Sequence, residues 1–370
     1  MAPPRILLVS HSLTRTGAPR VLVDMANWLN GHGWSVIVVN VNTAAQAPLA
    51  ADLAPEICYW PMPQFAVSNK LWHRALNWLL GGRQRLKFIA RILDEVRPDI
   101  VMINTVFHLD INDLVMARGM ICVRYLLEAE RYFHQLPDAD TGRLMDPRLH
   151  IITVDEDLAR FIRNFFQQRI DLVALPPAPL TRVDNLPAKE PPYQVLGMAA
   201  AGLTKGFDLF CAVADKVLST RQDAVFIYVG PTDDKEFLEI GLRRVREENR
   251  DRLIVTGFVP DVKPYFENAA LFLYPVRQDP YPIVGLWALA YGMPVVGFHN
   301  CFMEDVVACN AGDKIPCYDL DTFAAAVNKR LDMLANGTTQ PIDASPILDN
   351  VQPERIKTKM EAYLRSLLPQ

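Results

Sequence analysis

The stretch RQDPYPIVGLWALAYGMP, residues 277–294, contains the features that decide the fold. The apolar run Leu271–Val276 precedes it, and Asp279 stands in the loop that follows this run. Pro282 suits the first turn of a helix, and a Gly-Met-Pro turn then leads into the apolar run Pro294–Phe298. A buried strand, a helix and another buried strand in this order form a βαβ unit, which requires parallel strands.

The same alternation of apolar strands and amphipathic helices extends outward from this block. Near the block it predicts strands at Gln194–Ala200, Ala224–Gly230 and Arg252–Phe258, and a helix over Phe207–Leu218. Closer to the N-terminus it predicts strands at Ile6–Ser10, Ser35–Asn40, Ile100–Asn104, Ile121–Leu126 and Ile151–Val154. We therefore expect an α/β protein made of two doubly wound, mostly parallel sheets.

A proline-rich stretch separates the two halves. Residues 176–193 hold six prolines, which cannot occupy central strands or helix interiors. We expect a domain over residues 1–175, a linker over 176–193 and a second domain over 194–352. A last helix over 353–370 is expected to cross back onto the first domain. Open parallel sheets bind ligands at the carboxyl ends of their strands, so two facing sheets would form a cleft.

Composition excludes several classes of protein. The chain has 370 residues, 50% of them hydrophobic and 22% charged, which is typical of a globular protein and not of a disordered or coiled-coil chain. With 38 basic and 42 acidic residues, a nucleic acid is not the expected partner. The six cysteines form no CxxC pair, so we expect no zinc site. No apolar run approaches 18 residues, and we expect a cytoplasmic protein.

Two loops have residues suited to binding an anion. Gly17 and Ala18 allow a close backbone approach before a helix that has Pro19 in its first turn. Lys205 and Gly206 open a helix after the small residues 199–202, where a lysine could neutralise a pyrophosphate. Neither loop has the GxGxxG fingerprint of nicotinamide dehydrogenases or the GxxxxGK[ST] sequence of P-loop kinases.

Four segments together resemble the retaining GT-B glycosyltransferases, family 4-like, which are also called glycosyl transferases group 1. They are SHSLTRTGAP at 10–19, KGFDL at 205–209, TGFV at 256–259 and the block from Asp279 to Pro294. The last is the most specific, because the family usually has E-P-F-G, a second Glu five residues later, and then A-x-A-x-G-x-P-V-V. The resemblance covers nearly the whole chain and implies two Rossmann-like domains that face each other across a cleft.

The resemblance also assigns roles to residues. The N-terminal domain would bind the acceptor and the C-terminal domain the nucleotide-sugar. Catalytic roles fall on Asn104, Glu128 and Asp279. Donor binding falls on Gly17, Ala18, Lys205, Phe258, Val259, Pro282, Ile283, Val284 and Trp287. The family's retaining transfer needs no metal or protein nucleophile, so no cofactor is expected, and the nucleotide-sugar is a substrate.

The chain departs from the family pattern at several of these positions. Asp279 is shorter than the usual Glu, and Trp287 stands where a second Glu would hold the ribose. Trp287 could pack in the core or stack on a ribose or base. The arginine that usually accompanies Lys205 is absent, and Asn104 replaces a common His. These departures keep open an alternative, a non-catalytic GT-B scaffold or regulatory protein with a degenerate donor site.

Three further features have a functional and a structural interpretation. His108 either lies near the acceptor or starts a helix, and Asp155-Glu156-Asp157 either binds a metal or caps a helix. Residues 70–97 interleave basic and aromatic side chains, as in a helix on an anionic membrane, although a solvated basic face explains them too. The sequence thus predicts a glycosyltransferase that acts on a glycan or lipid-linked acceptor in surface polysaccharide synthesis, as a cytoplasmic or peripheral membrane protein.

Overall fold

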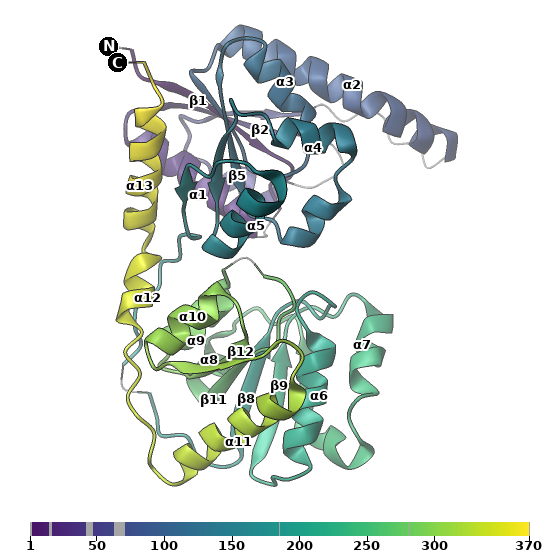
Figure 1. The fold of residues 1–370 in the computed structure, drawn as a ribbon, viewed down its shortest axis with the longest axis vertical. Helices are drawn as coiled ribbons and strands as arrows, with labels where there is room; N and C mark the ends of the chain where they lie inside the picture. Colours follow the sequence, from purple (N-terminus) through teal and green to yellow (C-terminus); the bar gives the residue numbers. More distant parts are fainter. Residues whose placement is uncertain are drawn as a thin grey trace. The chain divides into compact units, whose positions relative to one another are not determined.

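A computed structural model describes residues 2–14, 17–41, 47–62, 71–184, 186–279 and 281–369, with the backbone alone for 71–81. The chain divides into two compact units, each an α/β domain (Figure 1). Unit 1 contains Met1–Pro177 and Glu354–Gln370, and unit 2 contains Ala178–Pro353. No helix among the described residues has the length and apolar character needed to cross a membrane.

Unit 1 is built on a seven-stranded parallel sheet with the strand order β3-β2-β1-β4-β5-β6-β7. The strands are β1 (Arg5–Ser10), β2 (Ser35–Asn40), β3 (Cys58–Pro61), β4 (Ile100–Ile103), β5 (Ile121–Leu126), β6 (His150–Thr153) and β7 (Leu172–Val173). The helices are α1 (Gly17–Gly31), η1 (Pro48–Asp52), α2 (Leu71–Val96), α3 (Asp110–Met116), η2 (Glu130–Gln135), α4 (Asp138–Leu144), α5 (Glu156–Phe166) and α13 (Pro353–Ser366).

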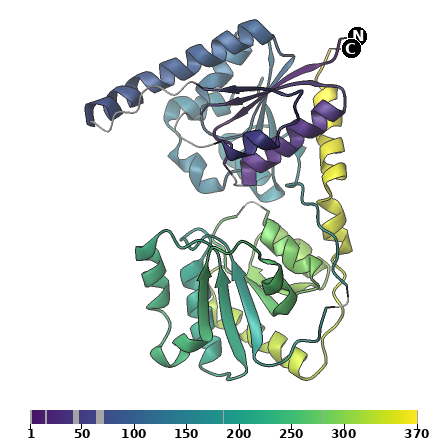
Figure 2. The same ribbon diagram turned by 180° about the vertical axis from the view of Figure 1, so that it is seen from behind.

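Alternate residues of the central strands supply two hydrophobic cores, one on each face of this sheet. Leu7 and Val9 of β1 point to the core shared with α2, α3 and α5. Ile6 and Leu8 point to the core shared with α1 and α13. The two helices can be followed in Figure 2. The C-terminal helix is tied down further because Glu361 accepts a 3.0 Å hydrogen bond from the Trp28 indole. Unit 1 is therefore completed by a segment from the far end of the chain.

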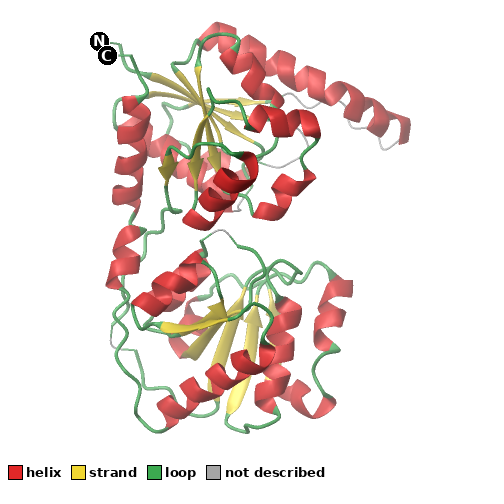
Figure 3. Cartoon of the chain, in the orientation of Figure 1, coloured by secondary structure: helices red, strands yellow, loops and turns green. Residues whose placement is uncertain are grey.

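Unit 2 is built on a six-stranded parallel sheet with the strand order β10-β9-β8-β11-β12-β13 (Figure 3). The strands are β8 (Tyr193–Met198), β9 (Ala224–Val229), β10 (Leu253–Gly257), β11 (Ala269–Tyr274), β12 (Val295–Phe298) and β13 (Gly312–Ile315). The helices are α6 (Phe207–Leu218), α7 (Lys235–Leu242), η3 (Glu247–Arg252), α8 (Lys263–Asn268), α9 (Ile283–Ala290), α10 (Cys301–Ala308), α11 (Leu320–Ala335) and α12 (Ser345–Asn350).

Short or polar strands are where the sequence pattern and the structure differ. The pattern predicts the long central strands to within a few residues, but it does not predict β3, β7 or β13. Such strands lack a long apolar run, and neighbouring strands recruit them through backbone pairing. The proline-rich stretch is not solvated throughout, because Val183 donates a 2.8 Å backbone hydrogen bond to Ala290 of α9.

Each sheet has a point where the order of its strands reverses direction. In unit 1 this point lies between β1 and β4, and in unit 2 it lies between β8 and β11. In open α/β sheets, loops that leave neighbouring strands there run to opposite faces, and ligands bind at the carboxyl ends of these strands. We call this place in each unit its crevice. The two crevices receive the loops with the predicted site residues, after β1 and β4 in unit 1 and after β8 and β11 in unit 2.

Candidate functional site

The crevice of unit 2 joins two oppositely charged residues. Lys205 lies in the loop between β8 and α6, and Asp279 lies in the loop between β11 and α9. The Lys205 ammonium donates a hydrogen bond to Asp279 Oδ1 and forms an ion pair with it. The sequence separates these residues by more than seventy positions, yet the reversal of strand order places their loops side by side.

The two partners differ in how far they are buried. The Asp279 side chain is 10% exposed and that of Lys205 is 35% exposed. Burial raises the pKa of Asp279 above its ordinary value, and the Lys205 charge and the Tyr274 hydroxyl oppose this shift. A buried carboxylate beside an accessible ammonium can accept hydroxyl protons on one side and neutralise an anion on the other.

Helix α9 begins directly after this pair, with Pro282 at its N-cap position. The side chain of Ile283 is 37% exposed, and Val284 is half-buried. The free amides of a helix start favour an anion. Trp287, one turn further on, packs on Phe266 with ring centroids 5.6 Å apart. The indole is therefore part of the aromatic packing between α8 and α9.

A further predicted pair, Phe258 and Val259, follows β10 at the edge of the same sheet. Phe258 is 76% exposed, which is unusual for so large an apolar side chain. The end of β10 is bonded to the loop after β9, because the Gly230 amide donates a 3.0 Å hydrogen bond to the Gly257 carbonyl. An exposed ring on a fixed loop is suited to stacking on a planar ligand.

The crevice of unit 1 joins the loops after β1 and β4. Asn104 is 1% exposed, and its Nδ2 donates a 2.7 Å hydrogen bond to the carbonyl of Ala18 in the first turn of α1. The Oδ1 of Asn104 is buried and has no hydrogen-bond partner among the described residues. Gly17 is exposed at the start of α1, and a Cβ there would meet no described atom within 4 Å.

Glu128 lies beyond β5, next to this crevice. Its Oε2 accepts a 3.2 Å hydrogen bond from the Leu127 amide, whereas Oε1 is buried without a partner in the described part of the chain. Burial raises the pKa of Glu128 above its ordinary value, and the nearby polar groups of Thr105 and Val106 and the His11 imidazole oppose this shift.

His11 was missed by the sequence analysis, although its place directly after β1 was a usable signal. Its Nδ1 is buried and lacks a partner among the residues that the structure describes. The unpartnered oxygens of Asn104 and Glu128 can each accept a hydrogen bond, and Nδ1 of His11 donates or accepts one according to its protonation and tautomer, so the crevice suits a ligand rich in hydroxyl groups.

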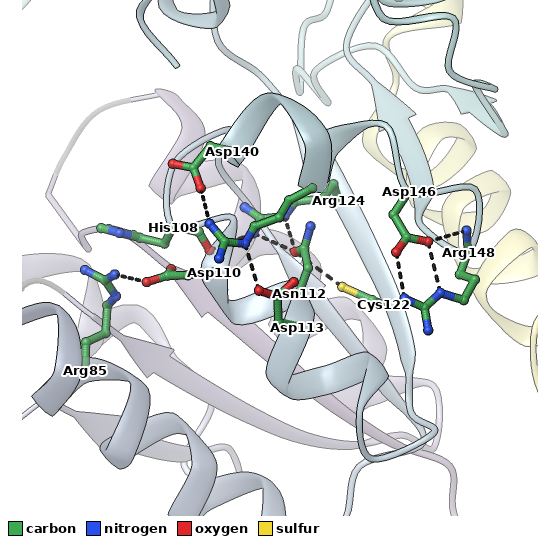
Figure 4. Close-up of polar contacts among 11 residues, drawn as sticks. Arg85, His108, Asp110, Asn112, Asp113, Cys122, Arg124, Asp140, Asp146 and Arg148 are labelled. Carbon is green, nitrogen blue, oxygen red and sulfur yellow. Dashed lines mark hydrogen bonds and ion pairs between the residues drawn. The ribbon is translucent and has the colours of Figure 1, made fainter. Parts of the chain in front are cut away.

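A buried arginine shapes the loop that carries this crevice (Figure 4). Arg124 of β5 is fully buried and donates to the carbonyls of Thr105, Phe107 and His108 at 2.6, 2.7 and 2.8 Å. It also donates to Asn112 Oδ1 at 2.9 and 2.7 Å. These contacts fix the backbone between β4 and α3, which places Thr105 and Val106 beside Glu128.

Two of the features with open interpretations are placed by the structure at helix starts. His108 precedes α3 with a φ of 58°, and burial, aided by Arg85, lowers its pKa to about 4. Its imidazole is therefore neutral near pH 7. Asp155 is the N-cap of α5 and accepts a 2.8 Å hydrogen bond from the Leu158 amide. In the described part of the chain, no group of three or more His, Cys, Asp or Glu residues could hold a metal ion.

Comparison with known proteins assigns a class to this architecture. Residues 194–333, most of unit 2, match the model of the family described as Glycosyl transferases group 1. The fold is that of the two-domain GT-B glycosyltransferases, and residues 194–333 resemble the group 1 family. No curated protein matches the chain.

Several solved structures resemble the whole chain. Sucrose-phosphate synthase from Thermosynechococcus elongatus is 16% identical over 98% of this chain and 99% of its own, with a TM-score of 0.74. Anabaena Alr3699/HepE in complex with UDP-glucose gives the same four values. The lipopolysaccharide outer core galactosyltransferase WaaB is 13% identical over 98% of this chain and 100% of its own, with a TM-score of 0.73. At these identities the likeness establishes the fold.

Proposed function

We propose that this protein is a glycosyltransferase that moves a sugar from a nucleoside-diphosphate sugar to an acceptor hydroxyl. The observation that carries the proposal is the ion pair of Lys205 with the buried Asp279. This pair lies at the reversal point of the sheet, inside the region that matches the group 1 family. A donor with a diphosphate next to a sugar would satisfy both charges of the pair.

The proposed reaction breaks the bond between the anomeric carbon and a phosphate oxygen and forms a bond from that carbon to the acceptor oxygen. Lys205 and the first amides of α9 (Ile283 and Val284) would stabilise charge on the departing diphosphate. Asp279 would bind hydroxyl groups of the sugar. Asn104 and Glu128 would orient the acceptor hydroxyl, whose proton goes to the departing phosphate. We propose that the reaction retains the anomeric configuration and needs no metal.

The proposed acceptor is a glycan or a lipid-linked glycan used in surface polysaccharide synthesis, and helix α2 supports a membrane location. Arg83, Lys87 and Arg91 are exposed at four-residue intervals on α2, while Ile89 and Ile92 are buried. Lys70 and the side chains of residues 71–81, part of the predicted basic and aromatic stretch, lie outside the described residues. A basic stripe of this kind attracts anionic lipids.

Flotation with liposomes tests this location. We expect the wild-type protein to float with vesicles that contain anionic lipid at low salt, and not with neutral vesicles. A variant with Arg83, Lys87 and Arg91 changed to Glu should not float with the anionic vesicles. If the wild-type protein fails to bind anionic vesicles at low salt, the membrane location is wrong.

Calorimetric titration without metal tests the donor site. UDP is the first probe, because Anabaena Alr3699/HepE was solved with UDP and with UDP-glucose, and GDP and TDP follow. We expect micromolar binding of one nucleotide, lost in Lys205→Ala. The matched control is Lys216→Ala, which removes a lysine of the same unit that pairs with Asp321 on the surface.

A non-catalytic scaffold is the second candidate function, and the packing of Trp287 on Phe266 favours it. Trp287 stands where the resemblance places a ribose-binding carboxylate, and an indole cannot accept that hydrogen bond. If no nucleotide binds to the folded wild-type protein, the donor site is degenerate and the scaffold becomes the better conclusion.

A further inference from the structure

We infer that Arg277 and Asp208 are positioning residues that lock the Lys205 loop onto the Asp279 loop and so set the geometry of the donor pair. Arg277 precedes Asp279 by two residues, and Asp208 lies in the first turn of α6, just after Lys205. The effect on ligand affinity rests on the proposed function, whereas the locking of the loops does not.

The contacts between the two loops are direct and numerous. The Arg277 guanidinium donates from Nη1 and Nη2 to the two carboxylate oxygens of Asp208 at 2.7 and 2.8 Å. Nη1 also donates to the Leu203 carbonyl at 2.7 Å, and the Arg277 amide donates to the Thr204 carbonyl at 3.0 Å. One arginine thus fixes both sides of the turn that presents Lys205.

The backbone of the turn also brings the Lys205 loop into close contact with the Asp279 loop. Gly206 has a φ of +71°, and a Cβ at this position would lie 1.9 Å from the Pro275 carbonyl oxygen. The two loops therefore touch at Gly206 and Pro275 as well as through Arg277. Lys205 lies between these two fixed points, and its ammonium reaches Asp279.

The Arg277–Asp208 pair is too buried to be an ordinary surface ion pair. The Asp208 side chain is 5% exposed. Burial alone would raise the pKa of this carboxyl, yet the hydrogen bonds and charge of Arg277 more than compensate, so that its pKa lies below the ordinary value. A buried bidentate pair has a defined geometry. Removing Arg277 leaves the buried Asp208 carboxylate with Arg244, 3.9 Å away, as its remaining cation.

Acylation of Lys205 tests the lock without any ligand. The full-length protein is treated with a limiting amount of an acetylating reagent, and mass spectrometry measures the rate at each lysine relative to Lys216. We expect Lys205 to react slowly in the wild-type protein and faster in Asp279→Asn, which removes its partner. Arg277→Gln should raise the Lys205 rate several-fold toward that of Asp279→Asn.

Two further variants separate positioning from loss of stability. Arg277→Gln combined with Asp208→Asn removes both charges, so it should fold better than the single change while keeping the fast Lys205 rate. Arg221→Gln is the matched control, because Arg221 makes a bidentate pair with Asp223 in the same unit. An unchanged Lys205 rate in both folded Arg277 variants, or an equal rise in Arg221→Gln, would overturn the inference.

Nucleotide binding then connects the lock to the proposed function. We expect Arg277→Gln to weaken UDP binding about tenfold and Arg221→Gln to leave it within twofold. If the wild-type protein binds no nucleotide but the acetylation rates change as expected, the lock holds and the proposed function fails. If UDP binds equally to wild type and to both Arg277 variants, the lock has no role in donor binding and that part of the inference is wrong.

Discussion

The two units fix their crevice loops with one arginine each, but they satisfy its charge differently. Arg124 of unit 1 donates to three carbonyls and an amide oxygen, and it forms an ion pair with no carboxylate among the described residues. Arg277 of unit 2 donates to the Asp208 carboxylate. Burial lowers the pKa of Arg124 to about 10, whereas hydrogen bonds to Asp208 raise the pKa of Arg277.

This difference in how the arginine charge is satisfied indicates what kind of ligand each crevice suits. In unit 1 backbone carbonyls and Asn112 accept the hydrogen bonds of the arginine, and the unpartnered oxygens of Asn104 and Glu128 can accept hydrogen bonds from a ligand. In unit 2 the arginine is neutralised by a carboxylate, and a second cation, Lys205, remains 35% exposed. A hydroxyl-rich molecule fits the first arrangement, and an anion fits the second.

Arg124 should be the more costly arginine to remove. We expect Arg124→Gln to lower the free energy of unfolding by about 3–5 kcal/mol, because several buried carbonyls lose their donor at once. Urea unfolding measures this effect. The control is Arg143→Gln, whose pairs with Asp113 and Asp140 lie near the surface, with an expected cost below about 1 kcal/mol. Equal costs for the two variants would contradict a structural role for Arg124.

Glu128 tests whether the units divide the work between acceptor and donor. We expect Glu128→Gln to slow sugar transfer about 100-fold, since an acceptor hydroxyl loses its anionic partner. UDP binding, measured by calorimetry, should stay as in the wild type. Glu130→Gln, a change at an exposed neighbour, is the control and should transfer normally. Loss of UDP binding in Glu128→Gln would refute the division of work.

The same substitution has an opposite effect on stability. Burial raises the pKa of Glu128, so its ionised form destabilises the folded state at pH 7 and its protonated form does not at low pH. We expect Glu128→Gln to be more stable than wild type by about 1 kcal/mol at pH 7. The difference should vanish as pH falls below the ordinary glutamate pKa. Urea unfolding measures the free energy of unfolding of the variant and the wild type at each pH. If their difference does not change with pH, burial does not destabilise the ionised Glu128 carboxylate.

Helix caps give the smallest expected effect and should be equal in the two units. Asp155 caps α5 of unit 1, and Asn300 caps α10 of unit 2 through a 2.9 Å bond from the Met303 amide. Replacing either with Ala should cost about 1 kcal/mol in unfolding free energy. Added Mg²⁺ or EDTA should change the rate of sugar transfer by Asp155→Ala to the same extent as it changes the rate of the wild-type protein. If the wild-type protein required Mg²⁺ for transfer and Asp155→Ala lost this requirement, the metal-binding interpretation of residues 155–157 would be restored.

Local sequence is sufficient to predict the class of fold. Nearly continuous apolar runs at Ser35–Asn40, Ile121–Leu126 and Ala224–Val229 and the helix Phe207–Leu218 are visible locally, because burial of a strand on both faces demands consecutive apolar residues. The block from Asp279 to Pro294 also marked a site, through an acid before a helix start and a turn before the next strand.

Which residues come into contact at each site depends on the order of the strands in the folded sheets. The reversal of strand order between β8 and β11 pairs Lys205 with Asp279, and no local pattern contains a strand order. The same holds for Arg124 and Arg277, whose partners come from other loops. His11 and Glu128 are neighbours for this reason too. Local sequence encodes secondary structure through short-range preference, whereas a site forms where buried sheets bring distant strand ends together.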